Sequence, residues 1–478
     1  MQRASAWREM RDTGHLGQFI ILCLGVWLHA ADSFLATTAI PVAVRDIGGV
    51  AFINWTLALY ALGAIVSGAG VGALARRFGM QAVLIAAGAL YGIGCVASAL
   101  APDMGAMLIG RLVQGIGGGI MVALSYVATQ RLFPEHLWTR LMAIVSAIWG
   151  ASALCGPLIG GAFAAAGLWR GAFWAFGGQA GVLILVSLVF LRGLPADGRA
   201  RGGWPWKPLL VLTVATVLIA AAGAIDSLAA SAGCVVLGGL LLYAAARVDA
   251  QGPDRLMPLE VLHPRHPVGA GLLMVLALAA GSTVFTNYGP LLLGLLFGVG
   301  PLGAGYIIAA ESIIWTLATL ATAGASPRWE VALIRTGTAA ILAGGVGLML
   351  FVSSGPVLAI IASVLLQGGG FGMCWPFVVR RIVAFAPDEE RDLAASATSS
   401  MQRIGYALGA SASGIAANAA GLAHGPSLAA AHAAGFWVFA AFVPVLGAGC
   451  LAAWRLTRPA GISGARALRG ASASDGSG

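Results

Sequence analysis

The sequence predicts an all-α integral membrane protein with fourteen transmembrane helices, grouped as six, two and six. Hydrophobic residues fill 59% of the 478 positions and charged residues only 9%, whereas a soluble globular domain carries about 25% charged residues. So little charge cannot cover a surface that faces water. Two further observations, the lengths of the apolar runs and the placement of the basic residues, give the number of helices and their orientation.

The apolar runs are long enough to cross a bilayer, since roughly 20 apolar residues in a helix span about 30 Å of hydrocarbon. Six spans come first, at 17–42, 52–75, 80–101, 104–130, 139–166 and 171–193. After the polar loop RGLPADGRARGGWPWK, two spans lie at 208–225 and 228–247. The last six follow a second polar loop and lie at 267–293, 301–323, 332–353, 356–379, 393–420 and 433–455.

The basic residues predict how the spans are oriented. With the N-terminus inside, 24 of the 27 basic residues fall in cytoplasmic segments, Arg403 among them, and the exceptions are Arg45, Arg111 and Arg170. Cytoplasmic loops of membrane proteins carry such an excess of Lys and Arg. We therefore expect a multi-pass protein of the plasma or inner membrane with both termini in the cytoplasm. No compact basic domain is present, so the net charge of +9 does not indicate nucleic-acid binding.

Spans 4 and 12 share a pattern that indicates an internal duplication. Gln114 lies 20 residues before Pro134-Glu135, and Gln367 lies 20 residues before Pro387-Asp388. The tetrapeptide GASA follows in the next span of each group, at 150–153 and 409–412. Chance similarity in Gly/Ala-rich sequence is the alternative, but two matches in register favour two six-helix halves around a central site.

The duplication predicts how the chain is divided. The expected parts are a cytoplasmic tail at 1–16, a six-helix half at 17–193, a linker with two inserted helices at 194–266, a second six-helix half at 267–456, and a cytoplasmic, disordered tail at 457–478.

Span 5 combines several glycines with a proline in the stretch WGASALCGPLIGG. Small residues let helices pack closely in lipid, and a proline removes a backbone hydrogen bond and bends the helix. We expect this bent, tightly packed helix to seal a pathway between the two halves; ordinary packing in the bilayer is the alternative. The residues of this motif are Gly150, Gly156, Pro157, Gly160 and Gly161.

Together these motifs resemble the major facilitator superfamily, and specifically its fourteen-helix drug:H+ antiporter branch, over nearly the whole chain. ADSFLATTAIP (31–41) is similar to the first-helix signature of that branch, and GASALCGPLIGG (150–161) to its antiporter motif. RLVQGIGGG (111–119) is similar to the helix-4 motif, with Arg111, Gln114 and Gly115 in place. The resemblance implies a major facilitator fold and proton-coupled export of amphipathic or lipophilic small molecules by alternating access.

The stretch GALARRFGMQ (72–81) departs from the gating loop of that family. Gly72, Arg77 and Gly79 match the family pattern, but Arg76 stands where the family has an acid. In the family this loop latches the cytoplasmic gate by charge pairing. The latch of this chain is therefore either in doubt or built from other residues.

Asp32 and Arg111 are charged residues inside predicted spans, where ionisable side chains are costly and usually functional. At 1.5 Å per residue, they lie roughly 22 and 20 Å from the cytoplasmic boundary, so the two charges can meet. Our hypothesis is that protonation of Asp32 releases Arg111 or changes the direction in which the cavity opens; a purely structural ion pair is the alternative. His29 lies on roughly the same face and either relays the proton or is structural.

Glu311 is the other acid clearly inside a span, near the middle of the membrane. It is a candidate second proton site or a counter-charge for a cationic substrate. Aromatic and amide side chains suggest a cavity for lipophilic or cationic compounds, although most of them suit packing or interface anchoring equally well. These candidates are Trp55, Tyr60, Asn287, Tyr288, Trp315 and Trp375.

Other classes of function fit the sequence less well. No Walker-type motif appears, so we expect a proton gradient rather than ATP as the energy source, with no cofactor and no metal. A membrane-embedded enzyme would need converging acids and histidines, and His263 and His266 lie in a Pro-rich loop without a cluster of acidic partners. A passive channel is disfavoured by the repeat. We therefore expect a monomeric exporter of drugs. The alternative is an exporter of the same fold that is dedicated to one metabolite, siderophore or lipid.

Overall fold

The computed structural model describes residues 14–48, 53–191, 206–222, 225, 227–252, 255–422 and 427–458, and this part of the chain contains helices and no β-strand. The predicted N-terminal and C-terminal tails lie largely outside the described residues. The N-half comprises α2 (Leu16–Ile47), α3 (Ile53–Ala69), α4 (Val71–Phe78), α5 (Met80–Ala99), α6 (Met104–Leu132), α7 (Glu135–Ala165) and α8 (Trp169–Phe190).

The second group of helices, the C-half, follows an inserted pair. The inserted pair is α9 (Trp206–Ala222) and α10 (Leu228–Gln251), and the short helix η2 (Leu259–Leu262) comes next. The C-half comprises α11 (Pro267–Phe297), α12 (Pro301–Thr322), η3 (Pro327–Trp329), α13 (Glu330–Phe351), α14 (Val357–Phe385), η4 (Asp388–Glu390), α15 (Arg391–Ala419), α16 (Leu428–Ala440) and α17 (Val443–Leu456).

Every predicted span coincides with a helix or with two consecutive helices. Among the described residues, eleven segments are long and apolar enough to cross a membrane, and the bent pair α3–α4, with an angle of 52° between its helices, makes a twelfth. Two predicted spans fall short of that test. Helix α9 has only 17 residues, and α15 is too polar, because it contains several Ser residues together with Thr398, Gln402 and Arg403. The count of fourteen spans stays a prediction.

The two halves repeat one packing pattern. In the N-half, α6 packs against α3 and α5, and α7 packs against α2; in the C-half, α14 packs against α12 and α13, and α15 against α11. The glycine after each motif glutamine also makes the same contact, because Gly115 faces the backbone of Tyr60 on α3 and Gly368 faces the backbone of Glu311 on α12. These contacts agree with the duplication that the two Gln-Gly pairs predict.

The GASA repeat was a wrong guide to the register of the next helices. Gly409 faces the backbone carbonyl of Ala280 on α11, and its counterpart in the N-half is Gly156, which faces the carbonyl of Ala31 on α2. Gly150 instead meets Thr316 in the opposite half. The similar tetrapeptides therefore occupy different positions, because small residues are interchangeable as sequence but not as contacts.

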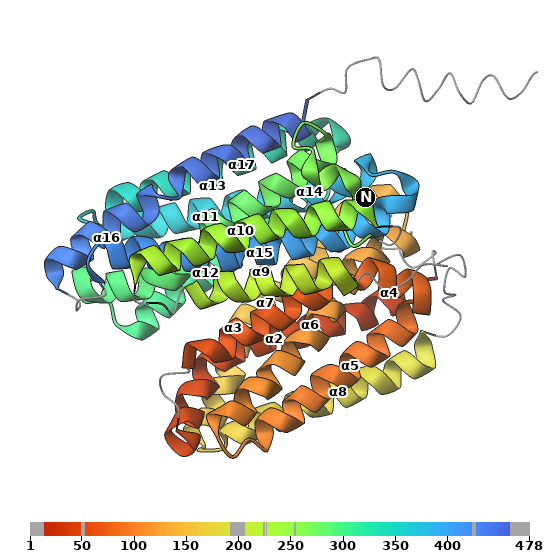
Figure 1. The fold of residues 1–478 in the computed structure, drawn as a ribbon, viewed down its shortest axis with the longest axis horizontal. Helices are drawn as coiled ribbons and strands as arrows, with labels where there is room; N and C mark the ends of the chain where they lie inside the picture. Colours follow the sequence, from red (N-terminus) through yellow and green to blue (C-terminus); the bar gives the residue numbers. More distant parts are fainter. Residues whose placement is uncertain are drawn as a thin grey trace, which may run out of the picture.

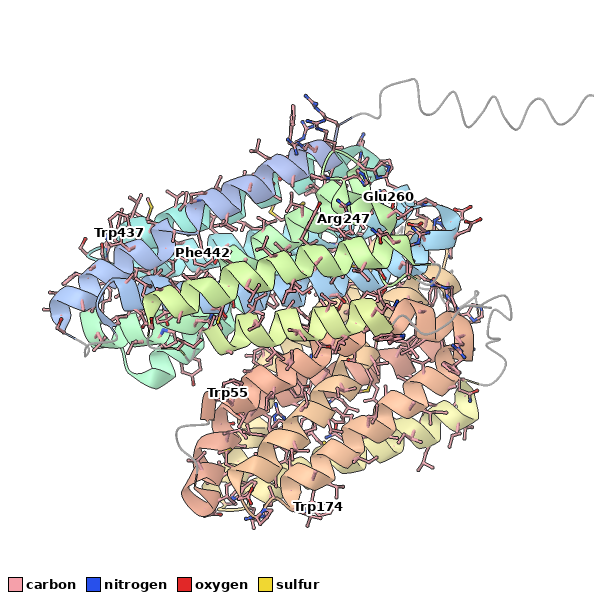
Figure 2. The ribbon with its side chains drawn as sticks, in the orientation of Figure 1. Trp55, Trp174, Arg247, Glu260, Trp437 and Phe442 are labelled. Carbon is pink, nitrogen blue, oxygen red and sulfur yellow. The ribbon has the colours of Figure 1, made fainter. Side chains whose placement is uncertain are left out.

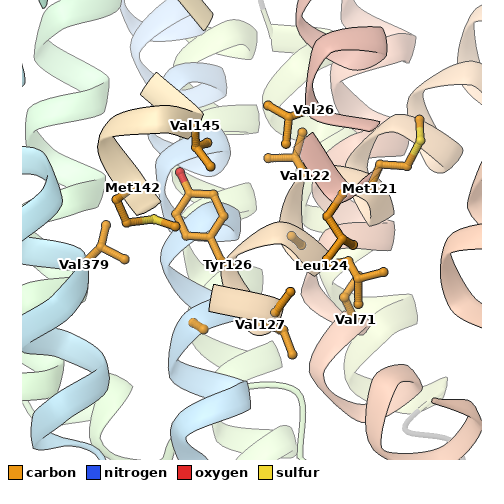
Figure 3. Packing of buried hydrophobic residues seen from close by; sticks show 14 of the residues in the cluster. Val26, Val71, Met121, Val122, Leu124, Tyr126, Val127, Met142, Val145 and Val379 are labelled. Carbon is orange, nitrogen blue, oxygen red and sulfur yellow. The ribbon is translucent and has the colours of Figure 1, made fainter. Parts of the chain in front are cut away.

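Among the described residues, the two halves share a large hydrophobic cluster at the end of the molecule where α2 begins and α17 ends, here called the terminus end. One hydrophobic cluster there combines side chains of both halves. Figure 3 shows part of it, with Tyr126 of α6 and Met142 of α7 near Val379 of α14. At the far end each half has its own cluster, around Phe285 and Phe439 in the C-half and around Ile40 and Phe173 in the N-half. The halves are thus joined at the terminus end, and they diverge towards the left of Figure 1.

The inserted pair lies against both halves. Helix α9 packs on α10, on α15 of the C-half and on α3 of the N-half. A small cluster joins Ile65 and Ala69 of α3 with Leu212 of α9, Ala245 of α10 and Ile404 of α15. The pair therefore covers one side of the junction between the halves (Figure 1).

Candidate functional site

Asp32 and Arg111 form an ion pair that is completely enclosed in the N-half. Both side chains have no exposed surface, and Nη1 of Arg111 donates to both carboxylate oxygens of Asp32 at 2.9 Å. The same Nη1 lies 3.2 Å from Oε1 of Gln114, which also accepts from Ser98 at 3.0 Å. The sequence prediction that the two charges meet is confirmed. Since a lone charge here would be very costly, each partner stabilises the other.

Arg111 is not saturated by these contacts. Its Nε and Nη2 atoms are buried and have no hydrogen-bond partner among the described residues. The guanidinium carbon instead lies 4.2 Å from the centre of the Tyr60 ring. Such a cation–π contact contributes more when both groups are removed from water, and it links the ion pair to the next residue of the network.

From Tyr60 the network continues through His29 into the C-half. The Tyr60 hydroxyl lies 2.8 Å from Nδ1 of His29 and 3.0 Å from the carbonyl oxygen of the same residue. The other ring nitrogen, Nε2, lies 3.0 Å from Nη1 of Arg403 on α15. The His29 ring also stacks on the Tyr60 ring and meets the Trp149 ring edge-on.

The geometry around His29 assigns its protonation state. Arginine has no acceptor, so Arg403 must donate and Nε2 must accept. Nδ1 then carries the hydrogen and donates to the Tyr60 oxygen, while the Tyr60 hydroxyl donates to the His29 carbonyl. All three contacts are satisfied by a neutral imidazole only. A second proton on His29 would turn the acceptor at Nε2 into a donor facing a guanidinium.

Arg403 is the functional candidate that sequence analysis missed. The charge count placed it in a cytoplasmic segment, but it lies roughly three turns into α15 and is half-buried between the halves. The assignment of Arg403 to the cytoplasm is wrong. Its positive charge can lie between the halves because His29 accepts a hydrogen bond from it. The signal was available, since Arg403 lies within the predicted span 393–420.

Glu311 has surroundings quite unlike those of Asp32. Its side chain is half-buried, and within the described part of the chain no hydrogen bond or ion pair involves its carboxylate. One turn later on α12, Trp315 stacks on Phe371 at 4.7 Å and meets Trp375 edge-on at 6.3 Å. An unpaired acid beside an aromatic cluster suits a cationic, apolar ligand or a proton.

The glycines of the antiporter motif serve two different surfaces. Gly150 meets the Thr316 side chain of the C-half, whereas Gly156 and Gly160 meet the backbone of Ala31 and Leu35 on α2. The Gly156–Gly160 pair packs within the N-half, and Gly150 is the motif residue that contacts the C-half. That this helix seals a pathway between the halves stays a prediction. Gly161 has open space where a side chain would start. Pro157 lies in the continuous helix α7, and its side chain is outside the described residues.

The expected loop at 72–81 is mostly helix, because residues 71–78 form α4 and Gly79 adopts a positive φ of 79°. The acid that this motif lacks is supplied by Asp392 at the start of α15. Asp392 accepts from Nε of Arg131 at 3.0 and 3.1 Å and from Gln130 at 2.6 Å, and it lies 4.0 Å from Arg76. The two halves are therefore joined by charges at the terminus end. Arg77 lies over the ring of Phe78.

The proposed cavity residues do not form one group. Tyr60 belongs to the buried network, and Trp315 and Trp375 form the aromatic cluster beside Glu311. Trp55 is half-buried in the first turn of α3 (Figure 2), and Asn287 is exposed. The hydroxyl of half-buried Tyr288 lies near Gly414 of α15. Sequence could not distinguish these roles, because each residue type suits both packing and ligand contact.

A comparison with protein families decides the assignment. The profile of the Major Facilitator Superfamily matches residues 22–410. The chain belongs to this superfamily. It is therefore a membrane transporter with small-molecule substrates and not an enzyme, as the sequence predicts.

Relatives within the superfamily include efflux proteins. The chain is 30% identical to a protein of Mycobacterium tuberculosis named "Probable multidrug-efflux transporter", over 95% of this chain and 96% of that protein. It is also 29% identical to the "Acurin A biosynthesis cluster MFS-type transporter" of Aspergillus aculeatus, over 52% of this chain and 47% of that protein.

Solved structures of major facilitator proteins share the fold. The human organic anion transporter MFSD10 aligns with a TM-score of 0.67 at 15% identity, covering 93% of this chain and 99% of that chain. FucP, in its outward conformation, aligns with a TM-score of 0.62 at 12% identity, covering 92% and 99%. At these identities the likeness concerns the fold alone.

Proposed function

We propose that this protein exports cationic, lipophilic small molecules across the plasma or inner membrane in exchange for protons. Its relative in Mycobacterium tuberculosis supports efflux as the direction and drugs as the cargo. A proton gradient is a sufficient energy source, because each charge that crosses 100 mV gains about 2.3 kcal/mol. The protein works as a monomer with cytoplasmic termini and without ATP.

Proton coupling is supported by one observation, the network that runs from Asp32 through Arg111, Tyr60 and His29 to Arg403. It begins in the N-half and ends in the C-half. Alternating access requires the halves to move relative to each other. A proton that enters the network at His29 replaces the contact with Arg403 by repulsion between two cations, so protonation and the movement of the halves are linked.

Glu311 is the proposed binding side chain for the cargo. Its unpaired carboxylate and the neighbouring aromatic cluster offer a negative charge and π surfaces together. A cationic substrate and a proton compete for the same carboxylate, which makes exchange obligatory. Asp32 has the different task of holding Arg111 in place.

With cytoplasmic termini, the joined terminus end corresponds to a closed cytoplasmic gate. The state described above is then the one in which substrate leaves towards the outside and protons enter. Arg76, Arg131 and Asp392 hold this gate closed.

Proton release from inside-out vesicles tests the proposal, with tetraphenylphosphonium as substrate under an imposed pH gradient. We expect release with the wild type, at least a tenfold loss with Glu311→Gln, and partial recovery with Glu311→Asp. His29→Gln keeps an acceptor for Arg403 but cannot be protonated, so proton-driven export should be lost while binding of tetraphenylphosphonium at Glu311 is kept. Glu389→Gln, an exposed acid in η4, is the matched control. Transport without proton release in the wild type would contradict antiport.

A further inference from the structure

A cavity of about 160 Å³ lies between the inserted pair and the C-half, away from the polar network. Leu212 of α9, Tyr243 and Ala246 of α10, Leu276 of α11 and Ile404 of α15 contribute to its wall, and Met257 closes one side. The lining is apolar apart from Tyr243 and Asp249. Because it opens beside helices that face the bilayer, its natural occupant is an apolar chain.

The acid in the wall is already satisfied. The carboxylate of Asp249 is buried and accepts the backbone N–H groups of Leu256 at 2.8 Å and Met257 at 2.9 Å. These bonds hold the segment that follows α10 against the cavity. Asp249 therefore shapes the wall and does not offer a charge to a ligand.

Two exposed cations flank the cavity where α9 begins and α10 ends. Lys207 precedes the wall residue Pro208 and lies 5.7 Å from the Trp206 ring. Arg247 follows the wall residue Ala246 and donates to the Tyr243 hydroxyl at 3.0 Å (Figure 2). Neither cation has an ion-pair partner among the described residues.

Aromatic and basic side chains together mark the level of lipid headgroups. Trp206 and Tyr243 are 59% and 55% exposed, and Trp and Tyr gather where the hydrocarbon meets the headgroups. Basic pockets between transmembrane helices bind the phosphates of lipids. The cations thus complement a phosphate, and the cavity beside them complements the chain attached to it.

We propose that this cavity binds a membrane phospholipid, with one acyl chain between α10 and α15 and the phosphate at Lys207 and Arg247. The occupant contacts α15 at Met401 and Ile404, on either side of Arg403. Helix α15 also carries Asp392, which joins the halves at the terminus end. A bound lipid therefore braces the helix that carries both Arg403 and Asp392, the two charges of the C-half that contact the N-half in the network and at the terminus end, and this gives the inserted pair a role of its own.

Native mass spectrometry of the full-length protein, delipidated in detergent and titrated with phosphatidylglycerol, tests the site. Each basic side chain near a lipid surface contributes about 1 kcal/mol, so Lys207→Ala/Arg247→Ala should weaken binding about thirtyfold. Arg328→Ala/Arg458→Ala is the matched control, because those arginines also lie over exposed tryptophans but do not line the cavity. An equal loss in both double variants would overturn the assignment to this site.

A second variant tests the acyl chain separately from the charges. Ala246→Trp fills the cavity and should abolish tight binding, whereas Ala244→Trp on the same helix should not. Unchanged binding by Ala246→Trp would refute occupancy of the cavity. Glycerophosphoglycerol, the headgroup without acyl chains, should not displace the lipid; displacement by it would show that the phosphate alone is bound. Lipid binding is measured without transport, so its failure leaves the antiport proposal untouched.

Discussion

The two halves have the same packing but different chemistry at matched positions. Contacts of Gly115 and Gly368 match Tyr60 with Glu311, and contacts of Gly156 and Gly409 match Ala31 with Ala280. In the same register, Asp32 corresponds to Gly281 and Arg111 to Val364. The N-half thus contains an enclosed ion pair where the C-half is apolar, and the C-half contains an unpaired acid where the N-half has a tyrosine.

This asymmetry shows how one scaffold separates two tasks. A fully paired acid exchanges its charge at high cost, because its partner would be left alone in a low-dielectric interior. An unpaired, half-buried acid can exchange a proton or a cation without disrupting the fold. Gly150 and Arg403 are matched in the same way, since each lies six residues before its paired glycine. On α7, Gly150 allows close packing against Thr316 of the C-half. On α15, the charged side chain of Arg403 contacts His29 of the N-half.

The largest expected difference between the halves concerns stability. Asp32→Asn leaves Arg111 as an uncompensated buried charge and should lower the free energy of unfolding by about 3–5 kcal/mol. Glu311→Gln removes a charge without a partner and should change it by about 0.5 kcal/mol or less. Denaturant unfolding of the purified protein in detergent measures both. Equal losses would mean that the two acids have the same structural role.

The charge contact at the terminus end should have an intermediate effect. Asp392→Asn weakens charge-assisted hydrogen bonds that each contribute about 1.5–3 kcal/mol, so the halves should separate at this end. Spin labels at positions 77 and 389 report the distance between the halves by pulsed electron resonance. Asp388→Asn is the matched control, because that acid is 85% exposed and its ion pair among the described residues is with Arg391, three positions later in the same half. A shift in the control but not in Asp392→Asn would contradict the assigned latch.

The smallest effects should distinguish the glycines of α7. At Gly150 an added Cβ would lie 2.9 Å from Cβ of Thr316, and such overpacking costs about 1–3 kcal/mol. Gly150→Ala should therefore lower the melting temperature and slow export of tetraphenylphosphonium. Gly161→Ala has open space and should stabilise α7 by up to about 1 kcal/mol. If both variants behaved alike, Gly150 would not be a contact between the halves.

The helices, the membrane location and the family can be predicted from the sequence alone. Length and apolar content decide whether a helix can cross a bilayer, and both are local properties that a sequence displays directly. The contact between Asp32 and Arg111 can also be predicted from the sequence, because the depth of a residue in the membrane follows from the helical rise per residue. The two motif glutamines likewise revealed the repeat at α6 and α14.

Which charges face one another across the interface can be seen in the folded molecule but not in the sequence. Arg403 was counted with the cytoplasmic charges, Asp392 was not recognised as the replacement for the missing acid at position 76, and the two GASA stretches were matched in the wrong register. Each error has the same cause. The role of a charged residue or a glycine depends on the residue that faces it. In the contacts of Arg131 with Asp392 and of His29 with Arg403, that residue lies more than 250 positions away in the sequence.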